Sequence, residues 1–282
     1  SRYFEKRRGK ALSYIWFGMS LGEFLFPVLI VYLLSFIYWR DLWMQISIVI
    51  LIFLPAIALF TIKDITILSR EEQNKEKKNI NTIKSWKRNE VLKDFKFYTI
   101  LPCLLAPAFI ITGIVINQSF ITESKGWGEY TLAKAFMSYA VLTVITLFIA
   151  GFLVDKFTSR KLLLFFNLPM LLSLFVLIFF KNTYSALLFM GLIGISNGFT
   201  NVLVSSLWAE IYGVKYLGSI KALTGALMVF STALATTVFG LLIDFGHSIE
   251  SISTICAIYV VISIAIVAMF LKTYNPVFIK KT

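Results

Sequence analysis

Charged side chains are scarce in this sequence of 282 residues: they make up 15% of the chain, against a hydrophobic fraction of 58%. Soluble globular domains carry about 25% charged residues. The composition therefore argues against an ordinary soluble enzyme. It argues more strongly against intrinsic disorder, because disordered chains are poor in apolar residues.

Residue types that carry catalytic or metal chemistry are also few. His247 is the single histidine, and both cysteines, Cys103 and Cys256, lie inside apolar runs without metal-ligand spacing. These counts predict neither a disulfide framework nor a zinc site, and we expect no metal and no cofactor. The apolar runs contain no nucleophile–base pair or carboxylate dyad, which argues against a membrane enzyme. They contain no filter sequence either, which argues against a channel.

Long apolar runs, by contrast, are abundant. Crossing roughly 30 Å of hydrocarbon takes about 20 apolar residues in a helix. Eight runs meet this requirement: 11–37, 42–62, 97–120, 131–154, 162–180, 184–209, 217–243 and 251–271. Because they do not alternate with period two, they predict eight transmembrane helices and not a barrel. The first run follows the basic segment SRYFEKRRGK, but it is too long for a signal peptide.

The basic residues are distributed unevenly between the two sides that these helices define. The chain has 27 Lys and Arg against 15 Asp and Glu, a net charge of +12. Of the 27, 23 lie on the side of residue 1, and four lie on the other side: Arg40, Lys125, Lys134 and Lys181. Such a bias marks the cytoplasmic side. We therefore expect both ends of the chain to be cytoplasmic, and a bacterial inner membrane as the location. Because the charges follow the topology, we expect no nucleic-acid partner.

One long polar segment, 63–96, separates the first two runs from the other six. It mixes ten basic with six acidic residues and is expected to be a solvated, partly flexible cytoplasmic linker. Alternatively, Ile80, Ile83, Val91 and Phe95 form the apolar stripe of a helix lying on the inner leaflet. Its Lys and Arg would then meet anionic lipid headgroups.

Glu23 is the clearest charged residue inside a predicted span. It follows Gly18 and Gly22 and precedes Pro27, near the middle of the first run. A carboxylate at this depth is costly and marks function by default, as a proton-titrating or solute-facing group. The alternative is a protonated or paired glutamate at a helix contact.

Two further groups of polar residues lie within predicted spans. Asn197, Asn201, Ser205 and Trp208 share one helical face of the sixth run, below Gly194. Near the outer half of the third run lie Thr112, Asn117 and Gln118. Amides in lipid need partners, so these residues face either neighbouring helices or a water-filled cavity.

The short loop between the fourth and fifth runs carries Gly151, Asp155, Lys156, Arg160 and Lys161. Asp155 can bind backbone donors at a helix start or pair with Arg160. From the chemistry alone, this is an ordinary charged turn.

This loop resembles the Gly-x-x-x-Asp-Arg/Lys-x-Gly-x-Arg-Arg/Lys signature of the major facilitator superfamily. In that family the signature follows the second helix and, in weaker form, the eighth. Four spans follow the loop here, so the resemblance implies an all-α, twelve-helix fold of which this chain has the last eight helices. Residues 1–62 would be the remnant of the N-terminal bundle, 63–96 the central cytoplasmic loop, and 97–282 the C-terminal six-helix bundle. Ser at position 1, in place of Met, agrees with missing upstream helices.

Other stretches are similar to particular branches of the family. The segment from Trp208 through Glu210, Gly213 and Lys221 resembles the connection between helices ten and eleven in monocarboxylate and oxalate–formate type transporters. Two positions depart from the family pattern. Thr158 stands where the signature has Gly, and Asn117 precedes Gln118 where related branches have His. The second departure removes an obvious titrating group.

The resemblance implies a monomeric secondary active transporter that works by alternating access, in which two bundles rock about a mid-membrane site. We expect a small organic solute, proton coupling, and solute-facing positions at Glu23, Thr112, Asn117, Gln118, Asn197, Asn201 and Ser205. Asp155 and Arg160 would latch the cytoplasmic side, and Glu210 with Lys221 would form a second pair at the inner gate. An efflux carrier of the same family, or a non-transporting membrane protein that binds anionic lipid, remains the alternative.

Overall fold

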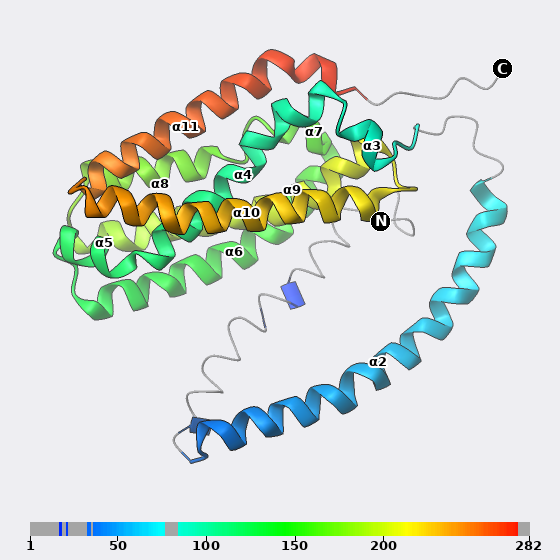
Figure 1. The fold of residues 1–282 in the computed structure, drawn as a ribbon, viewed down its shortest axis with the longest axis horizontal. Coiled ribbons are helices and arrows are strands. Elements are labelled where there is room, and N and C mark those ends of the chain that lie inside the picture. Colours follow the sequence, from blue (N-terminus) through cyan, green and yellow to red (C-terminus); the bar gives the residue numbers. More distant parts are fainter. Residues whose placement is uncertain (1–16, 19–20, 22–32, 35, 77–83, 276–282) are drawn as a thin grey trace. The chain divides into compact units, whose positions relative to one another are not determined.

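The computed structural model describes residues 17–18, 21, 33–34, 36–76 and 84–275, and every extended regular element in these ranges is a helix (Figure 1). The chain divides into two compact units, which are treated separately below. One unit contains α2 (Trp39–Glu76). The other contains the remaining helices: α3 (Arg88–Val91), α4 (Phe95–Ile116), α5 (Gln118–Lys125), α6 (Glu129–Phe157), α7 (Ser159–Leu162), α8 (Leu168–Phe179), α9 (Thr183–Tyr212), α10 (Leu217–Asp244), α11 (Ile249–Phe270) and the 3₁₀-helix η1 (Leu271–Tyr274).

Helix α2 is longer than the sequence predicts. Its apolar part, Trp39–Ile57, is long enough to cross a membrane, and the helix then continues to Glu76. The expected linker begins at residue 63, so its first part, up to Glu76, is helical, and the boundary of the linker stays a prediction. This part is helical because 63–76 is rich in Lys, Arg, Glu and Gln, which favour helix after the chain has left its apolar segment.

Six helices in the described ranges are long and apolar enough to span a membrane: Trp39–Ile57 and segments of α4, α6, α9, α10 and α11. The predicted run 11–37 lies almost entirely outside the described residues. Run 162–180 is not one continuous helix, which corrects the prediction. Helix α7 ends at Leu162, turns follow as far as Asn167, and α8 has only 12 residues. Asn167 is the N-cap residue of α8, and Pro169 in the first turn favours a helix start.

The predicted run 97–120 is also interrupted. Helix α4 ends at Ile116, and α5 begins two residues later and ends at Lys125, where it is followed by Gly126 with a φ of +64°. At the break, both the backbone N–H and the side-chain amide of Asn117 donate to Gly113 O, at 3.3 and 2.8 Å. An Asn side chain that bonds the backbone in this way competes with helix continuation.

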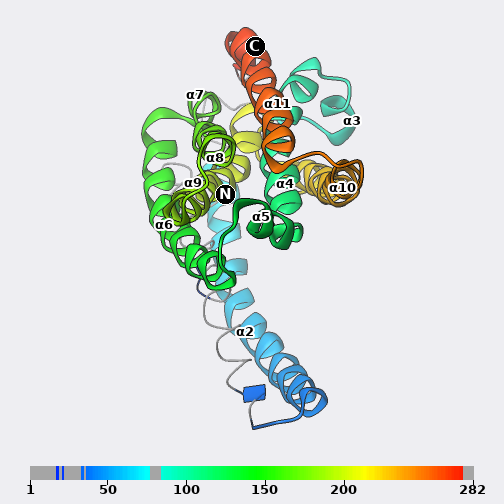
Figure 2. The same cartoon turned by 90° about the vertical axis from the view of Figure 1, so that its left-hand side faces the viewer.

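Glycines in α9 let α6 pack directly against its backbone. A methyl group on Gly194 would lie 2.4 Å from Tyr139 O, and one on Gly198 would lie 2.8 Å from Thr143 O. The Thr143 hydroxyl donates to Gly194 O at 3.1 Å. Small residues at helix contacts in membranes allow this close approach. In the end-on view, α6, α9 and α8 form one row, α4 and α10 lie beside each other, and α11 contacts both α8 and α4 (Figure 2).

Candidate functional site

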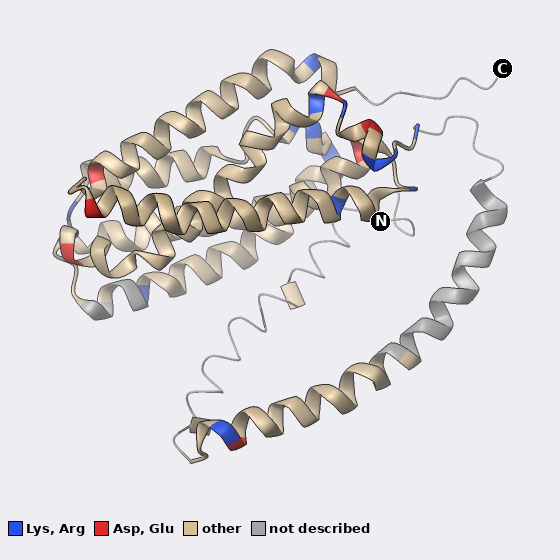
Figure 3. Cartoon of the chain, in the orientation of Figure 1, with Lys and Arg blue, Asp and Glu red and all other residues tan. Residues whose placement is uncertain are grey.

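The unit that contains α3 to α11 is called the second unit below. Its charged side chains gather at its two ends (Figure 3). The end where α4 and α10 begin and α9 finishes carries many Lys and Arg, together with some Asp and Glu. We call this the basic end. The opposite end holds Lys125, Lys181 and Glu250. Which end faces the cytoplasm stays a prediction from the sequence.

A clasp at the basic end joins the signature loop to α9. Arg160 Nε donates to Glu210 Oε1 at 2.5 Å, and the Ser159 backbone N–H donates to Glu210 Oε2 at 2.8 Å. Arg160 Nη1 also donates to Asn275 Oδ1 at 2.7 Å. The Arg160 and Glu210 side chains are only 21% and 19% exposed. Ionic hydrogen bonds that are shielded from water in this way are stronger than surface pairs.

The clasp occupies both carboxylate oxygens of Glu210. They accept from the Ser159 backbone N–H and from Arg160, and the pair of Glu210 with Lys221 stays a prediction. Asp155 is half-buried in the last turn of α6, and the latch between Asp155 and Arg160 stays a prediction. Of the other predicted loop residues, Gly151 is buried in α6, whereas Lys156 and Lys161 are exposed.

Thr158 adopts the backbone conformation for which the signature has Gly. Its φ is +73° and its ψ is 146°, and it is the one non-glycine residue with positive φ in the described ranges. Its N–H donates to Val154 O at 3.1 Å, so a backbone hydrogen bond closes the end of α6. The Cβ atom makes this conformation strained for any residue other than glycine.

The polar face predicted on α9 meets two different environments. Asn197 Nδ2 donates to the Tyr139 hydroxyl of α6 at 2.8 Å, which is an interhelical bond. Asn201 and Ser205 are half-buried further along the helix. Trp208 is completely buried, and its ring stacks on Tyr212 with centroids 5.8 Å apart, so it belongs to the core and not to a cavity.

The polar residues near the end of α4 lie close together. Thr112 is half-buried, and the Asn117 amide is bound to Gly113 O. Gln118 lines a small, mostly apolar cavity with Ile114, Val115, Ile121, Phe136, Phe189 and Met190. Glu23 lies outside the described residues.

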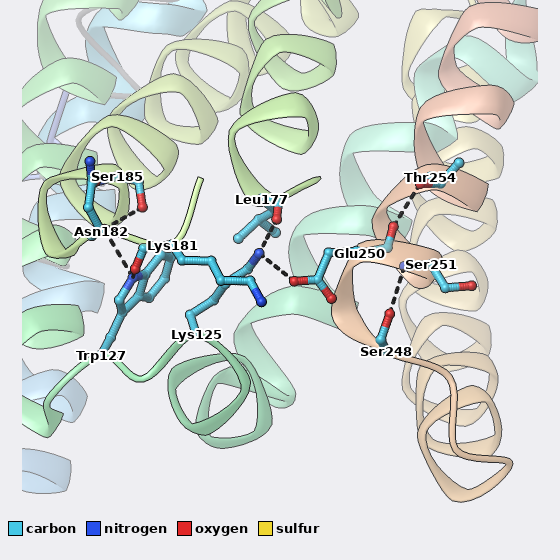
Figure 4. A network of polar contacts seen from close by, with 10 residues as sticks. All are labelled: Lys125, Trp127, Leu177, Lys181, Asn182, Ser185, Ser248, Glu250, Ser251 and Thr254. Carbon is cyan, nitrogen blue, oxygen red and sulfur yellow. Dashed lines mark hydrogen bonds and ion pairs between the residues drawn. The ribbon is translucent and has the colours of Figure 1, made fainter. Parts of the chain in front are cut away.

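The opposite end carries a network that the sequence analysis passed over (Figure 4). The Lys125 side chain is fully buried and donates to Leu177 O, at the end of α8, and to Glu250 Oε1 at 2.8 Å. Trp127 Nε1 donates to Lys181 O at 3.1 Å. These bonds join α5, α8 and α11. From the sequence Lys125 was counted only as an outer charge, because its partners are far away along the chain.

The end of the polar linker is fastened to the last turn of α9. The backbone N–H of Trp86 donates to the backbone carbonyl of Tyr212 at 3.0 Å. The two aromatic rings meet edge to face, with their centroids 5.5 Å apart. Gly213, with φ of +77°, leaves room for Ser85, whose Oγ would lie 2.8 Å from a methyl group there. Glu90 accepts from the Lys87 N–H at 2.6 Å, and this bond, together with Lys84, lowers the pKa of the Glu90 carboxyl.

Six apolar helices of spanning length, charges confined to the ends of the second unit and glycine-mediated helix packing define a multi-pass integral membrane protein. The family model of the Major Facilitator Superfamily matches residues 100–280, which is well over half of the chain. The chain belongs to this superfamily of membrane transporters, whose members are typically not enzymes. No curated protein matches it.

Proposed function

We propose that this chain forms the last eight helices of a twelve-helix secondary active transporter for a small organic solute. The observation that carries the proposal is the family match, which begins in α4 and covers the five spanning helices of the second unit. On this assignment α4 to α11 form the C-terminal bundle, and α2 is the last helix of the N-terminal bundle. Residues 11–37 would supply the remaining predicted span, and α7 with α8 the broken one.

The proposed transport mechanism is alternating access about a mid-membrane site. Thr112, Gln118, Asn201 and Ser205 are the solute-facing candidates, because they lie on α4, α5 and α9 and are not fully buried. Asn197 would shape the site from its bond to Tyr139. The clasp of Arg160 and Glu210 would hold the inner end of the bundle in one state, with Asp155 and Lys221 as neighbouring charges.

Coupling to protons is part of the proposal and is assigned to Glu23. It is the acidic residue nearest the middle of a predicted span. Carboxyls in an apolar setting hold their proton more strongly than they do in water, and so can exchange it near neutral pH.

The experiment is solute-dependent proton flux in liposomes. The complete transporter that contains this chain is reconstituted with an internal pH dye, and small mono- and dicarboxylates are tested first because of the branch resemblance. We expect acidification with at least one solute and its loss in Glu23→Gln. Asp155→Asn should slow flux without abolishing solute binding. Solute uptake that is independent of the pH gradient would contradict the coupling, and no uptake of any solute class would contradict the transporter proposal.

A further inference from the structure

Pro107 leaves a gap in the hydrogen-bond ladder of α4. In an α-helix the amide of residue 107 would bond the carbonyl of Cys103, but proline has no N–H. Cys103 is fully buried, so water cannot replace the missing donor from the surface. A buried carbonyl without a partner is costly, and in a membrane span it must be satisfied from within the protein.

Asn167 supplies the missing donor. Its Nδ2 donates to Cys103 O at 2.8 Å and lies 3.4 Å from Cys103 Sγ. Because a carbonyl only accepts, the bond also fixes which end of the amide faces α4. Asn167 is 0% exposed, and it stands at the break between α7 and α8 that interrupts the predicted span. The break thus places one amide inside the bundle, opposite the gap in α4.

We propose that Asn167 is a positioning residue for the solute site. Its bond to Cys103 O fixes the direction of α4 at Pro107, and so fixes where Thr112, Asn117 and Gln118 lie. That these three residues contact solute rests on the proposed transport function, whereas the bond between Asn167 and α4 does not. Thr112 lies five residues beyond Pro107, and the other two lie at the α4–α5 break. Any loss of order at the gap is therefore transmitted directly to them.

A double substitution tests this inference. Asn167→Leu replaces the amide by an apolar side chain of similar size and leaves Cys103 O without a donor. Pro107→Ala restores the backbone N–H, so that Asn167 becomes dispensable. The readout is hydrogen–deuterium exchange in residues 108–116, with residues 184–212 of α9 as an internal reference. We expect roughly five- to thirtyfold faster exchange in Asn167→Leu, and exchange close to that of the unmodified protein in the double variant.

Tyr259→Phe is the matched control. This substitution removes the hydrogen bond that the Tyr259 hydroxyl donates to Pro102 O at 2.8 Å. The Pro102 carbonyl still has the backbone N–H of residue 106 as a donor. Its effect should therefore not be rescued by Pro107→Ala. If Asn167→Leu fails to fold, the inference still requires that the double variant folds.

The inference is overturned if Asn167→Leu exchanges like the unmodified protein, or if the double variant stays as fast as the single one. Either result would mean that Asn167 does not repair the ladder. Exchange involves no solute, so the two proposals fail separately. Rescue without any transport would contradict only the transporter proposal.

Discussion

Arg160 Nε lies 2.5 Å from Glu210 Oε1, although the two residues are 50 positions apart in the sequence. The same carboxylate accepts from the Ser159 backbone N–H, so one acidic side chain closes the turn that follows α6 and ties it to the end of α9. The geometry of the signature loop therefore depends on a residue outside the signature.

Neutralising Glu210 tests the clasp. Glu210→Gln keeps the size of the side chain but removes its charge, leaving Arg160 partly buried without an ionic partner. We expect a loss of about 1–3 kcal/mol in unfolding free energy, measured by thermal or denaturant unfolding in detergent. Glu123→Gln, at an exposed position in α5, is the control and should change little. Equal effects of the two substitutions would contradict the clasp.

Replacing Thr158 by glycine should stabilise the protein. Glycine adopts φ of +73° without a clash with Cβ, and so relieves strain worth about 1 kcal/mol. Thr158→Ala keeps the Cβ and should give no such gain. Unfolding of both variants under identical conditions checks this, and a gain for alanine equal to that for glycine would show that the benefit is not conformational.

Alanine substitutions at two glycines should differ in their effect on the free energy of unfolding. Gly194→Ala places a methyl group 2.4 Å from Tyr139 O and should destabilise the α6–α9 contact by about 1–3 kcal/mol. Gly225→Ala, in the middle of α10, meets nothing within 4 Å and should be neutral or slightly stabilising. If both glycines tolerate alanine equally well, the two helices are not packed backbone to backbone.

Substitutions of the two partners in the ion pair of Lys125 and Glu250 should lower the free energy of unfolding by different amounts. Glu250→Gln leaves the fully buried ammonium of Lys125 without its counter-charge, and should cost about 3 kcal/mol of unfolding free energy. Lys125→Met removes the buried charge itself, and the exposed side of Glu250 can turn to water, so the loss should be smaller. Unfolding curves of the two variants decide the order, and the reverse order would be inconsistent with a buried lysine.

The cap formed by Glu90 predicts a pH dependence in the linker. Its pKa is lowered from 4.5, first by the Lys87 N–H and then by Lys84, so the folded form favours the carboxylate. The contribution is fully present above pH 4.5 and is lost as the pH falls through the lower folded value. Hydrogen–deuterium exchange in residues 84–92, corrected for intrinsic rates, should become faster as the pH falls from 4.5 through the folded pKa of Glu90. Glu90→Gln should remove the dependence, and an unchanged profile in that variant would place its origin elsewhere.

Composition and apolar run length were enough to predict an all-helical membrane protein, because burial in lipid leaves few alternatives for the backbone. The five spans of the second unit follow the predicted runs closely at most of their ends. The breaks at Asn117 and Asn167 were missed. Apolar neighbours hide the single Asn167 in a hydropathy pattern, and the polar residues Asn117, Gln118 and Ser119 lie close to the end of the predicted run. The combination of an Asn with Pro169 two residues later was the available signal.

The partners of charged residues could not be predicted from the sequence. The sequence offers two basic residues as partners of Glu210, Arg160 and Lys221, and the structure pairs it with Arg160 through the packing of α7 against α9. Lys125 finds Glu250 across 125 positions of sequence. Resemblance to the signature drew attention to this loop, but it gave no information on which side chain would close it.

The bond from Arg160 to Asn275 has a practical consequence for shortening the chain. Because the same guanidinium binds Glu210 and the residue just beyond η1, a truncation that removes Asn275 takes away one partner of the side chain that holds the signature turn. Shortened forms of the protein should therefore keep Asn275.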